Sequence, residues 1–583
     1  MKLTTRLKLS TLSAFLAAGL VSLANAASDA PNFIIMYIDD LGWADTSVPM
    51  MDSEPESKSD FYQTPHLEVL AARGMRFSNA YAPAPTCTPS RKSIQFGKTP
   101  GRLQYTFVHD VLANKRKLKW VDEVSMADVL KDSGKGYVTA HFGKGMAARE
   151  RMSEIGYDVT DEYDIGSNGN FHGDYVDIKS RKKLPADDPK RMRSLKKSSV
   201  DFVREHAGEK PFFMMISHYA VHVPHEASPE LIEKYRNSPR GKYCKDEDYL
   251  PTDQISASKK NSHWRLQYAA MIDEIDQGLG ALVAELEAAG ELDNTYIIYT
   301  SDNGGGMRPN GPLGWGKAQL YEGGLRVPMV VAGPGVKENV QCDVPVVQWD
   351  YLATIHDLAG VSTPLPDDLD GGSLRGVFER GNAAEVERPV EGMVFHYPCY
   401  FAPPMSVIRV GDYKYMKHLL TGETQLFNLK NDYSEKFNLV REMPEKAAEL
   451  DKVLSDYLVS IDAEDVQDVY QARLEELDHF EAQSRAIFAR ESARLDPVAD
   501  ADKIAQQKKR LDDNLLRFEK NREEVAVYRN SSHWAGGPPS NILTSTSPSL
   551  VADTSPSLVA DIPYTDSGSD HLWSNSDNWQ GSN

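Results

Sequence analysis

The sequence of 583 residues predicts an α/β fold, in which a large, mostly parallel sheet is sandwiched by helices and followed by a smaller C-terminal α+β subdomain. Two patterns support this prediction. Between Pro31 and Ile408, short apolar runs alternate with longer amphipathic stretches, as is typical of parallel strands covered by helices on both faces. From Ser406 to Leu439, short alternating segments follow one another closely, which indicates an antiparallel hairpin region.

The individual elements follow from the same patterns. We expect strands at Phe33–Ile38, Tyr137–Ala140, Phe212–Ile216, Tyr296–Tyr299 and Met329–Val331, and helices at Thr64–Arg73 and Ser262–Ala289. Residues 444–527 are charged and helical in pattern, and an octapeptide is then repeated in tandem at Thr546–Asp553 and Thr554–Asp561. The expected organisation is a signal peptide at 1–26, an α/β domain at 27–375, an α+β subdomain at 376–443, a helical extension at 444–529 and a low-complexity tail at 530–583 that acts as a linker or anchor.

The N-terminus has the pattern of an export signal. Lys2, Arg6 and Lys8 precede an apolar run, and Ala24-Asn25-Ala26 follows it, so we expect cleavage after Ala26 and a mature protein that is periplasmic or secreted. The apolar run is shorter than the roughly 20 residues that span a bilayer, and no later stretch is apolar enough, so no transmembrane segment is expected. The chain's cysteines are too few for a disulfide scaffold and match no zinc pattern; they are Cys87, Cys244, Cys342 and Cys399.

The overall charge excludes one class of partner. The chain carries 65 Lys+Arg and 85 Asp+Glu, a net charge of −20, whereas binding to nucleic acid or to anionic membranes needs a basic face. We therefore expect no nucleic-acid partner.

Polar residues follow four of the expected strands directly. Asp39-Asp40 follows the first, Asp302-Asn303 the fourth, and His141 and Lys144 the second. The third leads into His218, His222 and His225. Because ligands of open parallel sheets bind beyond the carboxyl ends of the strands, we expect these side chains to converge on one rim.

Four of these residues indicate a metal site. Asp39, Asp40, Asp302 and Asn303 offer only hard oxygen ligands, which suit Ca²⁺ or Mg²⁺ rather than zinc. Adjacent aspartates aimed at one point repel each other unless a cation neutralises them. An Asp-Asp pair by itself is more often a helix cap or a turn, but the matching Asp302-Asn303 pair favours the metal site.

Cys87 lies in Pro85-Thr86-Cys87-Thr88-Pro89-Ser90-Arg91, where Pro89 favours the start of a helix. A cysteine at that place lies among unpaired backbone N–H groups and near Arg91, which suits an activated nucleophile that faces an anion. A buried, unreactive cysteine fits the same residues, and the local pattern alone leaves both interpretations open.

Taken together, these motifs resemble the type I, formylglycine-dependent sulfatases of the alkaline phosphatase superfamily. The resemblance covers about Pro31 to Leu439. The matching segments are Cys87-Thr88-Pro89-Ser90-Arg91 with Gly97-Lys98, Ile38–Trp43, Ser301–Gly305, His222-Val223-Pro224, Gly316-Lys317 with Glu322–Pro328, and Asp412–Lys414 with Leu426–Leu429.

The resemblance implies a mechanism and roles for the site residues. A maturation enzyme would oxidise Cys87 to formylglycine (3-oxoalanine) before folding, and a hydroxyl of the hydrated aldehyde would attack sulfur. Ca²⁺, rather than Mg²⁺, would be bound by Asp39, Asp40, Asp302, Asn303 and the modified Cys87. Arg91 would steady the modified residue, Lys144 and Lys317 would bind sulfate oxygens, and His222 would protonate the leaving alcohol, although His218 and His225 lie close enough in sequence to be alternatives.

The chain departs from the family at one point. The family has a histidine two residues after the lysine of the second strand, whereas this chain reads Gly143-Lys144-Gly145-Met146. His141 precedes the lysine and is a candidate replacement, so the usual hydrogen bond to the nucleophile is the part of the resemblance in question.

The expected substrate is a sulfated carbohydrate. Phe395-His396-Tyr397-Pro398 resembles an element of bacterial glycan sulfatases, and we expect Lys98, His141, His172 and His396 to contact substrate. Nine lysines and arginines against two aspartates between Lys179 and Lys197 form either a solvated surface loop or a landing strip for a polyanionic glycan. Two other functions fit the motifs: a phosphate or phosphonate ester hydrolase, and a non-catalytic glycan-binding protein in which Cys87 is never converted.

Overall fold

The computed structural model describes residues 30–108, 122–146, 151–161, 163–164, 176–177, 188–223, 225–249, 264–306, 310–399, 403–496 and 498–530. The predicted signal peptide, the tail after residue 530, His172 and residues 179–187 of the basic stretch lie outside these ranges. None of the described helices is both long and apolar enough to cross a membrane.

An eight-stranded sheet forms the centre of the larger part, with the strand order β11-β2-β10-β9-β1-β8-β4-β5. Four neighbouring strands, β9, β1, β8 and β4, run parallel, whereas β10 pairs antiparallel with both β9 and β2. The bounds are β1 Asn32–Ile38, β2 Met75–Phe77, β4 Val138–Gly143, β5 Val159–Thr160, β8 Phe212–Ser217, β9 Thr295–Ser301, β10 Met329–Ala332 and β11 Val340–Cys342. The mostly parallel sheet is therefore confirmed, and each of the five predicted strands is present.

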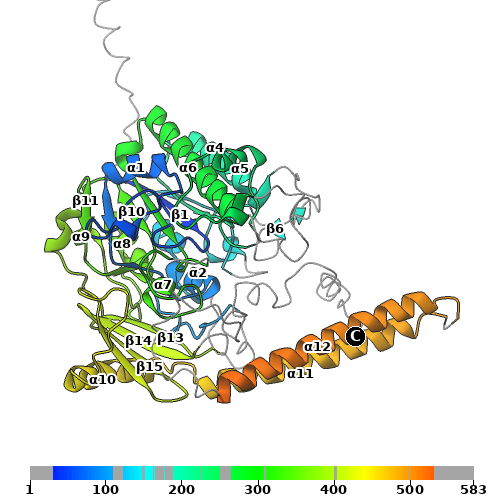
Figure 1. Ribbon diagram of the computed structural model, residues 1–583. Coiled ribbons are helices and arrows are strands. Elements are labelled where there is room, and N and C mark those ends of the chain that lie inside the picture. Colours follow the sequence, from blue (N-terminus) through cyan, green and yellow to red (C-terminus); the bar gives the residue numbers. More distant parts are fainter. Residues whose placement is uncertain are drawn as a thin grey trace, which may run out of the picture.

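Helices cover both faces of this sheet (Figure 1). Alternate residues of β1 point to opposite faces, so Ile34 packs in one core with α4 and α6, and Ile35 in a second core with α2, α3 and α8. The bounds are α1 Pro65–Ala72, α2 Cys87–Phe96, α3 Met126–Lys131, α4 Met192–His206, α5 Pro229–Arg236, α6 Trp264–Ala289, α7 Glu322–Leu325, α8 Tyr351–Leu358 and α9 Arg375–Arg380. All seven residues of β1 are buried, which explains why the predicted strand reads as a continuous apolar run.

The C-terminal part contains a separate antiparallel sheet in the order β13-β14-β15-β16, which confirms the predicted α+β subdomain. Its strands are β13 Met393–Tyr397, β14 Met405–Val410, β15 Tyr413–His418 and β16 Thr424–Asn428, and α10 Pro444–Ser460 packs on it. Two short pairs of strands form separate two-stranded sheets: β3 Ala80–Tyr81 with β12 Val346–Val347, and β6 Tyr163–Asp164 with β7 Val176–Asp177. The exact domain boundaries stay a prediction.

The charged segment after α10 forms a helical hairpin. α11 (Val466–Ser492) and α12 (Ala501–Asn530) lie lengthwise against each other and project from the rest of the molecule as a long arm (Figure 1). The base of the arm is anchored by Val466, Tyr470 and Val525, which pack into the same core cluster as Ala318 and Leu320.

Candidate active site

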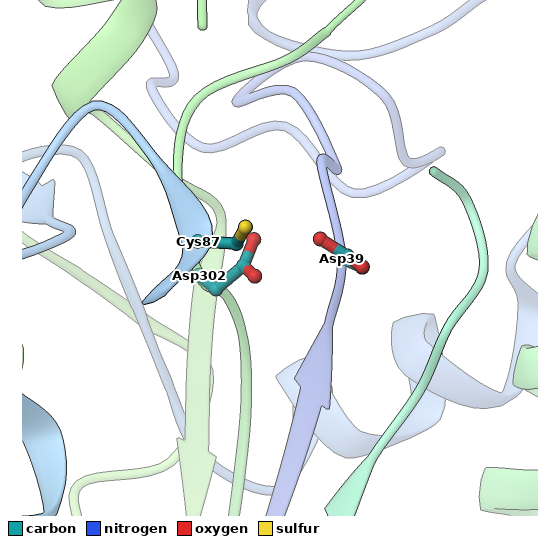
Figure 2. A group of neighbouring side chains, drawn as sticks. All are labelled: Asp39, Cys87 and Asp302. Atoms are coloured by element: carbon teal, nitrogen blue, oxygen red, sulfur yellow. The ribbon is translucent and has the colours of Figure 1, made fainter. Parts of the chain in front are cut away.

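The carboxyl ends of β1 and β9 bring two aspartates together with Cys87. The strands pair in register, Ile38 beside Ser301, so the residues that follow, Asp39 and Asp302, are neighbours. α2 begins at Cys87 and presents its thiol to them. Figure 2 shows Cys87 beside Asp302, with Asp39 facing both from the end of β1. One ligand atom from each of the three residues lies within 4.8 Å of the others, and all three side chains are buried.

Asp40 and Asn303 extend this group. The Asn303 side-chain amide donates to Asp40 Oδ1 over 2.8 Å, and the Asp40 backbone N–H donates to Asp302 Oδ1 over 3.1 Å. Two buried oxygens, Asp39 Oδ1 and Asn303 Oδ1, accept no hydrogen bond from any described residue. We refer to Asp39, Asp40, Cys87, Asp302 and Asn303 as the rim cluster. Its acceptors without donors and its hard oxygen atoms fit a divalent cation such as Ca²⁺.

Three cationic side chains surround the rim cluster. Lys144 Nζ lies 2.5 Å from Asp39 Oδ2, and Lys317 Nζ lies 2.7 Å from Asp40 Oδ1. Arg91 Nη2 lies 2.7 Å from Asp302 Oδ2, and its Nη1 donates to the Lys144 carbonyl over 3.1 Å. The structure therefore brings every predicted metal ligand and three predicted catalytic residues to one place; their catalytic roles stay predictions.

Burial and these charges act on the carboxyl groups in opposite directions. Burial would raise the pKa of Asp39, but Lys144, His222 and Arg91 hold it well below its usual value. Burial raises the pKa of Asp302 to about 7, and the charge of Asp39 adds to that shift. The same cations thus act unequally on the two neighbouring carboxylates, Asp39 and Asp302.

The turns that carry the two lysines depend on close backbone contacts. Gly143 has a φ of 96°, and a Cβ there would lie 1.9 Å from the Ser217 carbonyl oxygen, so only glycine permits the turn before Lys144. The Lys317 N–H donates to the Gly305 carbonyl, and the Ala318 N–H donates to the Pro85 carbonyl, two residues before Cys87. These bonds tie the Lys317 loop to the loops after β9 and before α2.

Among the described histidines near the rim, His222 lies against the rim cluster. Its Nδ1–H donates to the Val223 carbonyl over 2.6 Å, which leaves Nε2 facing Asp40 Oδ2 at 3.8 Å. Burial, with Lys317 nearby, lowers the pKa of His222 to about 3. His218 is buried, and neither ring nitrogen bonds to a described residue. His225 packs against the rings of Trp264 and Tyr268.

Three predicted substrate ligands have other neighbours. His141 is buried against the ring of Tyr157, and burial lowers its pKa to about 3. Lys98 Nζ lies 2.5 Å from Glu123 and 2.6 Å from Asp368. His396 uses both ring nitrogens within the C-terminal part, toward Ser406 Oγ and the Glu464 carbonyl. Their contact with substrate stays a prediction, as does that of His172, which lies outside the described residues.

Met146, which stands where the family pattern has a histidine, is buried in the apolar core under the rim. Asn310 also supports the site, and the sequence patterns did not indicate it. Its side-chain amide donates to the Trp315 carbonyl over 2.7 Å and holds the loop of Lys317, and the Asn310-Gly311 turn signal was the clue available in the sequence.

Comparisons with known proteins agree with this geometry. Residues 31–361 match the family model described as Sulfatase, and residues 311–464 match one described as N-sulphoglucosamine sulphohydrolase, C-terminal. A protein named Sulfatase from Formosa agariphila is 28% identical over 501 residues, covering 72% of this chain and 86% of that protein. N-acetylglucosamine-6-sulfatase of Bos taurus is 30% identical over 317 residues, covering 50% of this chain and 56% of that protein.

Solved structures with the same fold include two carbohydrate complexes. A protein in complex with k-i-k-neocarrahexaose has a TM-score of 0.60 and 24% identity, covering 74% of this chain and 93% of that chain. A protein in complex with its substrate D-glucosamine-2-N,6-O-disulfate has a TM-score of 0.59 and 22% identity, covering 74% of this chain and 98% of that chain.

Proposed function

The chain belongs to the sulfatase family, whose model covers residues 31–361, and on that premise we propose that it is an exported hydrolase of sulfate esters on carbohydrates. The observation that carries the proposal is the convergence of Asp39, Cys87 and Asp302 within 4.8 Å of one another, with Lys144 and Lys317 beside them. Such a site combines a nucleophile, a place for a cation and two ammonium groups, which are the parts that transfer of an anionic group requires.

The rim cluster would hold Ca²⁺ through Asp39, Asp40, Asp302, Asn303 and the modified Cys87. When bound, the ion would withdraw charge from a sulfate oxygen. Asp39 Oδ1 and Asn303 Oδ1, which are buried acceptors without a described donor, support this ligand set.

The remaining roles follow from position. Cys87, converted to formylglycine by a maturation enzyme, would attack sulfur, and Arg91 would steady it from the same helix, α2. Lys144 and Lys317 would bind the sulfuryl oxygens, since a cation at the carboxylates would replace the ammonium groups as their counter-charge. His222 would donate a proton to the leaving oxygen through Nε2, the nitrogen that faces the rim cluster, once the negative charge of a bound sulfate ester raises its pKa from about 3 and Nε2 becomes protonated.

A carbohydrate substrate is supported by the relatives. N-acetylglucosamine-6-sulfatase is named for an amino sugar sulfate, and two solved neighbours hold saccharides. The predicted export to the periplasm or beyond agrees with a glycan substrate outside the cell.

Two measurements test the proposal. Peptide mass spectrometry of the Cys87 peptide should show replacement of the thiol by the lighter aldehyde. Sulfate release should then be measured on 4-nitrophenyl sulfate, N-acetylglucosamine-6-sulfate, N-acetylgalactosamine-6-sulfate, D-glucosamine-2-N,6-O-disulfate and carrageenan oligosaccharides, with 4-nitrophenyl phosphate in parallel.

We expect faster turnover of at least one sugar sulfate than of the phosphate ester. A strong preference for phosphate would instead indicate a phosphate ester hydrolase. An unmodified Cys87 in protein that binds these sugars without turnover would indicate a glycan-binding protein.

A further inference from the structure

Two consecutive cations of the basic stretch are buried beside the active site. Lys190 and Arg191, just before α4, have exposed fractions of 0% and 1%. They therefore belong neither to a solvated loop nor to a surface strip that a glycan could reach. Both have left-handed backbones, with φ values of 57° and 55°, which is disfavoured for residues with a Cβ.

Lys190 contacts the segment that carries His222. Its Nζ donates to the His222 backbone carbonyl over 2.6 Å. The same histidine bonds its own Nδ1 to the next carbonyl, at Val223. The ring orientation of His222 thus depends on a short backbone segment to which Lys190 is hydrogen-bonded.

Arg191 contacts the turn that carries Lys144, through one intermediate residue. Arg191 Nη2 lies 2.8 Å from Asp161 Oδ2, and Asp161 Oδ1 accepts the Gly143 N–H over 2.8 Å. Gly143 is the positive-φ residue immediately before Lys144. Asp161 thereby links a buried guanidinium to the backbone turn from which Lys144 reaches Asp39.

The backbone that carries Lys190 and Arg191 is held in place by Asp188. Asp188 accepts the N–H groups of Arg193 and Ser194 over 2.8 and 2.9 Å, which fixes the start of α4 directly after them. From this fixed start of α4, the side chain of Lys190 reaches the loop after β8, and that of Arg191 reaches the turn after β4 through Asp161.

We propose that Lys190 and Arg191 are positioning residues, with Lys190 setting the His222 segment and Arg191, through Asp161, setting the Lys144 turn. This inference rests on the proposed function, because it assigns the pair to the proton donor and to the sulfate-binding lysine. Neither cation touches the reacting atoms in this arrangement. Together they keep the two loops at a constant spacing.

The dependence of kcat/KM on the leaving group distinguishes the role of Lys190 from that of Arg191. Loss of a well-placed proton donor slows esters of alcohols far more than esters of nitrophenol, whose anion leaves without a proton. Loss of a sulfate-binding lysine slows both alike, because the sulfuryl oxygens are the same in both esters. We therefore compare kcat/KM on 4-nitrophenyl sulfate with kcat/KM on the fastest sugar of the panel, for Lys190→Met, Arg191→Met and Asp161→Ala.

For Lys190→Met we expect the sugar sulfate to lose on the order of tenfold more than the aryl sulfate, since small displacements of catalytic groups have effects of this size. In Arg191→Met and in Asp161→Ala, kcat/KM should fall by the same factor on both esters. The double variant that combines these two changes should have a kcat/KM no lower than that of Asp161→Ala, because both act through the same contact. The substrate ratio does not depend on the folded or converted fraction. Lys190→Gln serves as a second variant, for which we expect the same change of ratio. Arg204→Met, an exposed arginine of α4 that pairs with Glu285 and lies outside the basic stretch, is the control with an unchanged ratio.

Hydrogen exchange tests the same pair without turnover. In Lys190→Met, exchange should accelerate at residues 217–223 and stay unchanged at 138–146. In Arg191→Met and in Asp161→Ala, it should accelerate at 138–146 and stay unchanged at 217–223. Equal losses on both esters for Lys190→Met, or acceleration of both segments by each variant, would overturn the inference. A wild type that releases no sulfate would contradict the proposed function alone, because the exchange pattern would still decide the positioning roles.

Discussion

Two buried charge clusters in this protein are built from similar side chains but differ in how completely they are paired. One is the rim cluster with its surrounding cations. The other, here called the joint cluster, lies where the larger part meets the C-terminal sheet and consists of Tyr81, Glu322, Arg326, Arg409, Lys414 and Glu435.

In the joint cluster each carboxylate oxygen of Glu322 has a donor. Oε1 accepts from Lys414 over 2.9 Å, and Oε2 accepts from Arg326 over 2.7 Å and from Tyr81 over 2.6 Å. In the rim cluster, Asp39 Oδ1 and Asn303 Oδ1 have no described donor. Glu435 Oε1 of the joint cluster also has no hydrogen bond from a described residue, but it lies 2.8 Å from Lys414 Nζ. A cluster whose carboxylate oxygens each face a donor or a cation at close range stabilises the fold, whereas the rim cluster keeps buried oxygens that a bound cation could use. Four predictions test this contrast, in order of decreasing expected effect.

Cys87→Ala should abolish sulfate release, by at least about 10⁴-fold in kcat, because it removes the proposed nucleophile. Thermal unfolding should be nearly unchanged, since the thiol makes no bond that the fold requires. Cys342→Ala is the matched control: this cysteine is buried in the core away from the rim, so turnover should persist while stability falls by about 1 kcal/mol. Residual turnover in Cys87→Ala would place the nucleophile elsewhere.

Lys414→Met should lower the free energy of unfolding by about 3–5 kcal/mol, because it leaves two buried glutamates without their shared partner. Urea unfolding measures this loss. The folded fraction should keep the kcat/KM of the wild type, and a loss below about 1 kcal/mol would remove the distinction between the two clusters.

Lys317→Met at the rim should reduce kcat by about 10²- to 10³-fold, the usual effect of deleting one group that stabilises transition-state charge. Its stability should fall less than that of Lys414→Met, because Asn303 still donates to Asp40. Kinetics and urea unfolding of both variants measure this difference. If the rim were a purely structural cluster, Lys317→Met would lose stability but keep the kcat of the wild type.

Calcium should raise the free energy of unfolding, by about 2.7 kcal/mol when free Ca²⁺ is 100-fold above its Kd, and chelation should reverse the effect. The shift should vanish in Asp39→Asn and persist in Lys414→Met, as measured by thermal unfolding across a calcium titration. An equal shift in both variants would place the ion outside the rim cluster.

The sequence predicted the sheet and its rim because both depend on local patterns. Apolar runs mark β1 and β9, and the polar residues after them identify the edge at which Asp39 and Asp302 meet. The same patterns cannot reveal partners that are distant in the chain. Lys98, whose contact with substrate stays a prediction, pairs with Glu123 and with Asp368, which is 270 residues away, and no local pattern indicates these partners. Lys190 and Arg191 looked exposed because charge alone does not report burial.

The burial of α2 limits the time during which another protein could reach Cys87. All ten residues from Cys87 to Phe96 are buried, and Cys87 becomes enclosed when the distant segment with Asp302 pairs beside Asp39. If Cys87 is converted as proposed, the maturation enzyme would have to reach its thiol between synthesis of Cys87 and closure of the sheet. A variant that folds faster, even without a change in its final structure, would shorten that interval and yield fewer active molecules.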